Sequence, residues 1–164
     1  MNEIELENLP KDIQEAIVLP KDETVIDIIN ARLIDVKAIV RGISQYRSGI
    51  LLASETTIIQ RQLFYPVALL IFTERHLIIV NRKMRYQPPY KRYLEVHKLG
   101  YDEIIEPFGD GKPLNIVARI DGELELFQFF QFFEGNYGNP GITTKGKPIS
   151  SDEFLEKLKA SRRD

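Results

Sequence analysis

The chain has 164 residues, of which 43% are apolar and 28% are charged, and this is the composition of an ordinary globular protein with one main domain. It contains no cysteine, which excludes disulfide frameworks, thiolate nucleophiles and the commonest structural zinc sites. The formal net charge is only −2, which argues against a protein that coats nucleic acid.

The small net charge hides an uneven distribution along the chain. Residues 1–35 carry three basic and nine acidic side chains, whereas 36–98 carry eleven basic and three acidic ones. Residues 99–144 return to two basic and eight acidic side chains, and 145–164 carry six and four. We therefore expect separate acidic and basic faces. The two acidic blocks beside the basic block disfavour binding to a long nucleic-acid duplex.

The first residues read MNEIELENLP, which is acidic where a signal or transit peptide needs positive charge. No apolar run in the sequence approaches the ~18 residues of a membrane span. We therefore expect a soluble, cytoplasmic protein.

Residues 1–48 are expected to form a helical segment ahead of the main domain. Asn8 can cap a helix, Pro10 suits its first turn, and Pro20 ends it. Residues 24–41 fit either a helix or a strand, because they are rich in Ile and Val but lack strict alternation. We favour a helix, since a strand of that length would be unusual. This helix would align one apolar stripe, which consists of Val25, Ile26, Ile29, Leu33, Val36 and Val40.

Residues 43–49 read ISQYRSG and suggest a linker. From residue 49 to 164, β-branched and aromatic runs alternate with turn residues every 8–12 positions, which is typical of an antiparallel barrel or sandwich. The expected strands are Thr57–Gln62, Pro66–Thr73, His76–Arg82, Tyr93–Lys98, Asp102–Pro107, Leu114–Ile120 and Glu123–Phe132.

Two turns and a final helix have clear local signals. Asp121-Gly122 lies between two alternating runs and predicts a two-residue hairpin turn, and Glu74-Arg75 suggests a second one. Ser150 and Glu153 have the spacing of a capping box, which predicts a helix after them. Its apolar face, formed by Phe154, Leu155 and Leu158, is expected to close the open mouth of the barrel.

Several short motifs in this region point to a known family. The run Ser54-Glu-Thr-Thr-Ile-Ile comes first. An expected hairpin follows, in which an apolar run leads into Thr73, Glu74 and Arg75, and one residue later into Leu77 and Ile78. The third motif is Tyr101-Asp-Glu-Ile-Ile. In these features residues 50–160 resemble the bacterial pleckstrin-homology-like (PH-like) and GRAM-type domains. The resemblance implies a mainly β fold, an α+β arrangement in which a seven-stranded antiparallel barrel is capped by a C-terminal helix. The N-terminal helical segment and the insertion at 136–147 depart from the minimal domain.

The first candidate binding site is the segment NRKMRYQPPYKR at 81–92, which holds five basic residues and no acid. A hairpin loop stiffened by two prolines could present arginines to phosphates of a lipid headgroup or to an acidic partner. The alternative is a solvated loop whose charges only aid solubility. Some PH-like domains bind phosphoinositides, so the resemblance implies that this loop is a candidate phosphoinositide-binding site. The candidate residues are Arg82, Lys83, Arg85, Tyr86, Tyr90, Lys91 and Arg92.

The second candidate is the aromatic run LFQFFQFFEGNYGN. On a strand of period two, Phe127, Phe129 and Phe133 face one side while Phe130 and Phe132 face the other. One face can pack in the barrel, and the other requires a helix of this chain or a second subunit to cover it. One interpretation is that other parts of this chain cover the second face. The alternative is an interface with another subunit or a partner, formed by Phe129, Phe130, Phe132 and Phe133.

Catalysis has little support in the sequence. The only histidines, His76 and His97, lie on different expected strands without metal-ligand spacing, and no serine lies in a nucleophile elbow. A small enzyme would require one of them to meet carboxylates in an enclosed pocket. We expect no catalytic residue, metal or cofactor. The expected function is a binding or adaptor module that uses protein–protein contacts or self-association, and the alternative is peripheral binding to anionic membranes through residues 81–92.

Overall fold

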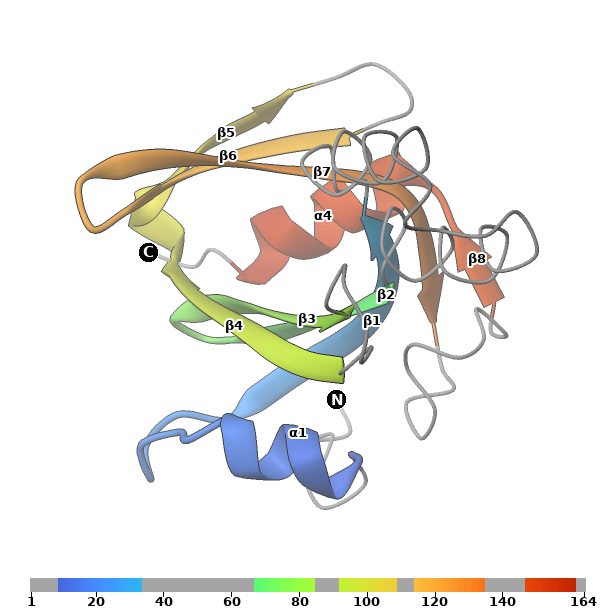
Figure 1. Ribbon diagram of the computed structural model, residues 1–164. Helices are drawn as coiled ribbons and strands as arrows, with labels where there is room; N and C mark the ends of the chain where they lie inside the picture. Colours follow the sequence, from blue (N-terminus) through green and yellow to red (C-terminus); the bar gives the residue numbers. More distant parts are fainter. Residues whose placement is uncertain (1–8, 34–66, 85–91, 109–113, 135–146, 162–164) are drawn as a thin grey trace, which may run out of the picture.

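The computed structural model describes residues 9–33, 67–84, 92–108, 114–134 and 147–161, and Figure 1 shows their arrangement. One short helix and one strand precede the main run of strands, and a longer helix ends the chain. The helices are α1 (Lys11–Ala16) and α4 (Ser151–Ser161). The strands are β1 (Val25–Leu33), β2 (Val67–Thr73), β3 (His76–Met84), β4 (Arg92–Gly100), β5 (Ile104–Phe108), β6 (Leu114–Ile120), β7 (Glu123–Glu134) and β8 (Lys147–Ile149).

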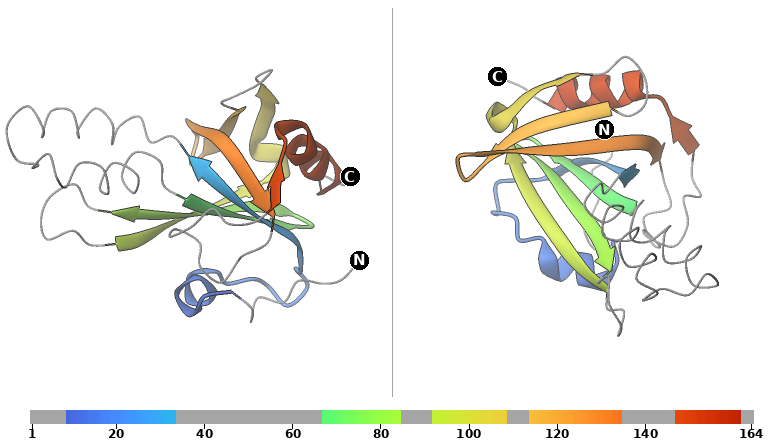
Figure 2. Two further views of the ribbon diagram at one scale, coloured as in Figure 1. Left: turned by 90° about the vertical axis from the view of Figure 1, so that its right-hand side faces the viewer. Right: turned by 45° about the horizontal axis from the view of Figure 1, so that its top comes forward.

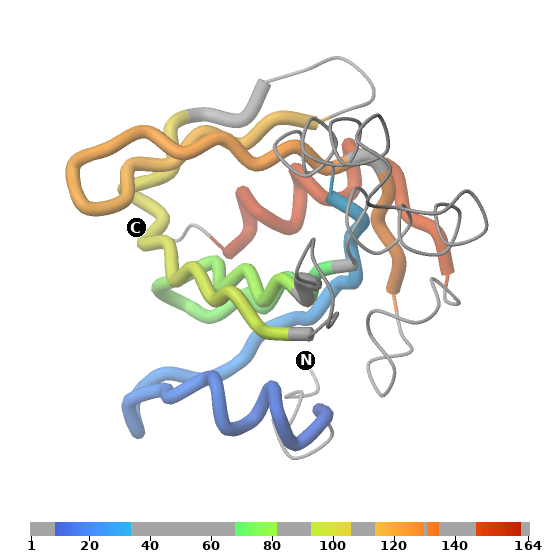
Figure 3. The backbone as a smooth tube through the Cα atoms, in the orientation of Figure 1, coloured from blue at the N-terminus to red at the C-terminus, as the bar shows by residue number. Residues whose placement is uncertain are grey.

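The described strands form one antiparallel sheet in the order β4-β3-β2-β1-β7-β6-β5, and β8 pairs with β7. β4 and β5 lie at opposite edges of the sheet although only the short turn Tyr101–Glu103 connects them. Three residues span at most about 11 Å, so the sheet must curve until its two edges approach each other at this turn. Figure 3 shows the chain passing through this corner. Within the described residues, β4 and β5 do not pair with each other, so the sheet is curved but not closed.

The curvature divides the buried side chains into an inner and an outer core. The inner core lies on the concave face and is covered by α4, which Figures 1 and 2 show inside the curve. The outer core lies on the convex face of β1–β4 beneath α1. Its main contributors from the α1 segment are Leu9, Ile13 and Ile17, which are 4%, 0% and 7% exposed.

α4 is held on the concave face by aromatic packing and by ion pairs. The ring of Phe154 stacks on Phe132 with centroids 4.4 Å apart, and it also contacts Phe72 at 5.9 Å. Lys157 Nζ donates to Asp27 Oδ2 at 2.6 Å and lies 3.2 Å from Glu134 Oε1. The helix is therefore tied to β1 and β7.

Most local signals of the second half are confirmed. β3, β4, β6 and β7 cover the expected strands, β2 covers the described part of Pro66–Thr73, and β5 begins at Ile104 after the short helical turn. Asp121 and Gly122 have φ values of 51° and 82°, the left-handed conformation of a two-residue hairpin turn. Ser150 Oγ accepts from the backbone N–H of Glu153 at 3.1 Å, as the capping spacing predicts. The expected strand Thr57–Gln62 and linker 43–49 lie outside the described residues.

The helix predicted from residue 24 is wrong over its described part. Within the described residues 9–33, the segment is helical only at Lys11–Ala16, and Val25–Leu33 is a strand between β2 and β7. Ile28 packs in the outer core while Ile29, Ala31 and Leu33 pack in the inner core. A strand covered on both faces loses the alternation that identifies it. Described elements on both sides of the expected boundary at 48 thus belong to one sheet.

The face predicted for Phe132 is also wrong, although Phe127 and Phe129 share a face as predicted. A β-bulge in β7 places two residues, Phe129 and Phe130, opposite Leu33 before pairing resumes between Gln131 and Arg32. The extra residue returns Phe132 to the same face as Phe129, with ring centroids 5.8 Å apart.

Candidate functional site

The basic segment 81–92 lies at the end of the β3–β4 hairpin. The register pairs Arg82 with Leu94, Lys83 with Tyr93 and Met84 with Arg92. Three of the predicted binding residues, Arg82, Lys83 and Arg92, therefore meet at neighbouring backbone positions. Arg85, Tyr86, Tyr90 and Lys91 lie outside the described residues.

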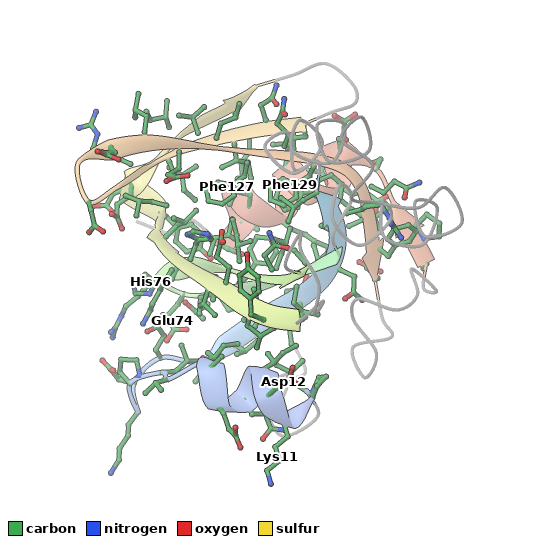
Figure 4. All side chains as sticks on the ribbon, viewed as in Figure 1. Lys11, Asp12, Glu74, His76, Phe127 and Phe129 are labelled. Atoms are coloured by element: carbon green, nitrogen blue, oxygen red, sulfur yellow. The ribbon has the colours of Figure 1, made fainter. Side chains whose placement is uncertain are left out.

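The predicted aromatic interface is not available at three of its four positions. Phe129, Phe132 and Phe133 are 0%, 2% and 9% exposed, because the chain itself covers them. Figure 4 shows Phe127 and Phe129 pointing from β7 into the interior. The side chain of Phe130 is outside the described set. Coverage within the chain, the alternative weighed for this run, therefore holds for these three rings.

A cluster that sequence reasoning missed fixes the entry to β1. Three consecutive residues ahead of β1 bind the tight turn between β2 and β3, near the corner where Figure 4 labels Glu74 and His76. We call this cluster the turn clasp, and it consists of Asp22, Glu23, Thr24, Thr73, Glu74, Arg75 and His76.

Glu23 is the centre of the turn clasp. Its Oε1 accepts from Thr73 Oγ1 at 2.6 Å and lies 2.5 Å from His76 Nδ1, and Lys98 Nζ lies 3.6 Å from Oε2. Burial of this side chain, which is 0% exposed, works to raise the pKa of Glu23. The hydrogen bonds from Thr73 and His76 and the nearby positive charges outweigh burial, so the pKa of Glu23 is lowered from its ordinary value of 4.5.

The other clasp contacts involve residues that carried the family resemblance. The Glu74 carboxylate accepts from the backbone N–H of Thr24 at 2.9 and 3.0 Å, and Arg75 pairs with Asp22. Tyr101 donates its hydroxyl to the Thr73 carbonyl at 2.6 Å, and burial raises its pKa well above the usual range. The Thr-Glu-Arg motif and Tyr101 therefore have a structural role in joining three parts of the sheet.

The second histidine lies in a polar cluster on the concave face. His97 Nε2 is 2.6 Å from Glu95 Oε1, and the His97 ring meets Phe127 edge-on at 5.1 Å. Asn81 is paired with Glu95 across the strands and is 7% exposed, and its buried Oδ1 has no hydrogen-bond partner among the described residues. This cluster lies at the margin of the inner core.

Both histidines thus meet a carboxylate, which the small-enzyme hypothesis required, but they do so on opposite faces of the sheet. His97 lies directly opposite Ile79, which belongs to the inner core. His76 is two residues before Ile78 on β3, so it lies on the face of Ile78, which belongs to the outer core. Side chains alternate between faces along a strand, so the two pairs cannot join in one site. Among the described residues, no group of three or more His, Asp or Glu could hold a metal ion.

The convex face of β5–β7 has a different character from that of β1–β4. Ile105 pairs with Val117 and Val117 with Leu126, and these residues point away from the inner core because their neighbours Ile104, Ile116 and Phe127 belong to it. Leu124 follows on the same face opposite Arg119. We call this set the outer apolar row, and it consists of Ile105, Val117, Leu124 and Leu126.

The outer apolar row is accessible to solvent. Ile105, Leu126 and Leu124 are 43%, 54% and 62% exposed. In Figure 1, no helix lies on the outer side of β5–β7 in the described part of the chain, whereas α1 covers the outer side of β1–β4. A contiguous exposed apolar patch on a sheet face is typical of an interaction surface.

A sequence signal for this row exists in the alternation of Glu123-Leu124-Glu125-Leu126 after a hairpin turn. Before the bulge, Phe127 and Phe129 lie on the opposite face of the strand from Leu124 and Leu126. Because these phenylalanines point into the inner core, the two leucines must face outward. The density of phenylalanines hid that signal, because apolar residues occur on both faces of the strand.

No protein-family model matches the chain, and no curated protein or solved structure matches it either. Within the described residues, neither helix has the length and apolar character needed to cross a membrane.

Proposed function

We propose that this protein is a non-catalytic binding module that acts through protein–protein contacts, and that the outer apolar row is its contact surface. One observation carries this proposal. The chain covers the apolar convex face of β1–β4 with α1, yet leaves three large aliphatic side chains exposed together on the convex face of β5–β7. Exposed apolar area of this kind is costly unless a partner buries it.

We further propose a PH-like module as the fold of this binding protein. The support is an antiparallel sheet of eight described strands, in the order β4-β3-β2-β1-β7-β6-β5 with β8 on β7, and a C-terminal helix on its concave face. The helix agrees with the capping helix that the family resemblance implies. Seven of the described strands, β2 to β8, lie within residues 50–160, which carry the resemblance, and β1 lies ahead of them. The non-catalytic assignment is supported by the separation of the two histidine–carboxylate pairs on opposite faces.

Co-purification from the native cell tests the contact surface. The tagged natural chain is compared with a Leu124→Lys/Leu126→Lys double variant, and Val18→Lys is the matched control because Val18 is 82% exposed outside the row. Exposed substitutions of this kind change stability by about 0.5 kcal/mol or less per site. We expect the natural chain and the control to retain the same proteins and the double variant to lose them. An identical set with all three chains would contradict the proposal.

A second candidate function is binding to anionic membranes through the basic hairpin. The observation in its favour is the register, which brings the backbone positions of Arg82, Lys83 and Arg92 together at one end of the β3–β4 hairpin. Sedimentation with anionic liposomes at low salt tests it. Binding that is lost on charge reversal of the five basic residues of 81–92 would support this function, and no binding at low salt would exclude it.

A further inference from the structure

We infer that the occupant of the outer apolar row is a second copy of this chain, packed face to face with its strands running opposite to those of the first. This inference rests on the proposed function, because it names the partner of the same surface. Two sheets that pack in this way would bury both rows in one layer, as in a β-sandwich. Each copy would give the other the cover that α1 gives to β1–β4.

The argument for a second copy comes from the polar residues that flank the row. On one side, Arg119 lies opposite Leu124, and it is exposed. On the other side, Asn115 lies opposite Gln128, and Gln128 Nε2 donates to Asn115 Oδ1 at 3.1 Å. The row therefore has a cationic flank and an amide flank. A guanidinium donates to amide oxygens, so the two flanks complement each other.

The orientation of the two copies follows from these flanks. A two-fold axis parallel to the row brings the cationic flank of each copy to the amide flank of the other, while Val117 meets its own counterpart. A two-fold axis parallel to the strands would bring Arg119 against Arg119, which like-charge repulsion disfavours. An interface of this type is isologous and closes at two copies. The product is a dimer with no open apolar row.

The absence of cysteine from the natural chain makes this arrangement directly testable, because a single introduced cysteine has no competitor. Asn115, Val117 and Arg119 alternate along β6 on the face that carries the row. The test uses the variants Asn115→Cys, Val117→Cys and Arg119→Cys with a short bifunctional thiol reagent. Val18→Cys is the control for random collision, since Val18 is exposed and outside the row.

The antiparallel arrangement predicts a specific set of cross-links. Val117→Cys should form covalent dimers alone, and a mixture of Asn115→Cys with Arg119→Cys should also form them. Arg119→Cys alone should form no more covalent dimer than Val18→Cys does. Cross-linking of Arg119→Cys alone would overturn the orientation, and cross-linking of no variant above the control would overturn the second copy as occupant. If no cysteine variant cross-links above the control, but proteins other than this chain are lost from the Leu124→Lys/Leu126→Lys variant in co-purification, the proposed function stands while this inference falls. If neither effect is seen, both fall.

Discussion

At the scale of single residues, Glu23 is the side chain on which the start of the sheet depends most. It is buried with its charge, and it binds Thr73 and His76 across the first turn. We expect Glu23→Gln to lower the free energy of unfolding by about 1–3 kcal/mol, because the charge-assisted hydrogen bonds weaken in a buried site. Chemical denaturation at neutral pH measures this difference. Glu15→Gln, an exposed change on α1, is the matched control and should have no comparable effect.

The same residue predicts a pH dependence with a definite sign. The pKa of Glu23 is lower in the folded protein than its ordinary value of 4.5, so its contribution to stability is complete above that pH. The contribution is lost as the pH falls through the lowered pKa, because the unfolded chain then binds the proton more tightly. The stability difference between the natural chain and Glu23→Gln should therefore shrink as the pH falls below 4.5. A difference that stays constant down to acid unfolding would contradict this role.

Asn81 gives the opposite kind of prediction. Its Oδ1 is buried, and no side chain or backbone group in the described part of the chain bonds to it, which is a cost to the folded state. We expect Asn81→Val to raise the free energy of unfolding by about 1 kcal/mol, since an apolar side chain of similar size removes that cost and suits a strand. Thermal unfolding followed by circular dichroism tests it. A lower midpoint for the variant would mean that the amide makes a stabilising contact.

At the scale of elements, α4 is the part that completes the inner core. Phe154 is fully buried and meets rings from both halves of the sheet, namely those of Phe72, Phe129 and Phe132. We expect Phe154→Ala to lower the free energy of unfolding by about 3–5 kcal/mol. Glu156→Ala, on the exposed side of the same helix, is the control. Equal stability of the two variants would show that the helix is not needed to close the core.

The elements also show why sequence reasoning succeeded in some places and failed in others. The Asp121-Gly122 hairpin and the Ser150 cap are local, because the signal and the structure it specifies lie within four residues. β1 was mistaken for a helix because both of its faces are buried by elements distant in sequence. The orientation of Phe132 depends on a bulge whose position is set by pairing between β7 and β1, about 100 residues apart.

The candidate surface was missed for a related reason. The basic hairpin was visible as composition, and the register confirms only that Arg82, Lys83 and Arg92 lie near one another in the backbone. The outer apolar row is formed by three strands, and its members are ordinary aliphatic residues. Whether such residues are exposed depends on whether another element covers them. That information is held by the tertiary arrangement of α1 and α4, not by the strands themselves.

At the scale of the whole molecule, the convex face of the sheet differs between β1–β4 and β5–β7. α1 buries the first part, and the second keeps the outer apolar row exposed beside a cationic and an amide flank. This asymmetry makes self-association the central claim. The turn clasp and α4 lie away from the row, so substitutions in the row should change association without changing the fold.

Sedimentation velocity over a wide range of protein concentration tests this claim most directly. The natural chain and Val18→Lys should convert from monomer to dimer as concentration rises, whereas Leu124→Lys/Leu126→Lys should stay monomeric with the same circular dichroism spectrum. A natural chain that remains a monomer at every concentration, or a double variant that dimerises as well as the natural chain, would contradict the account.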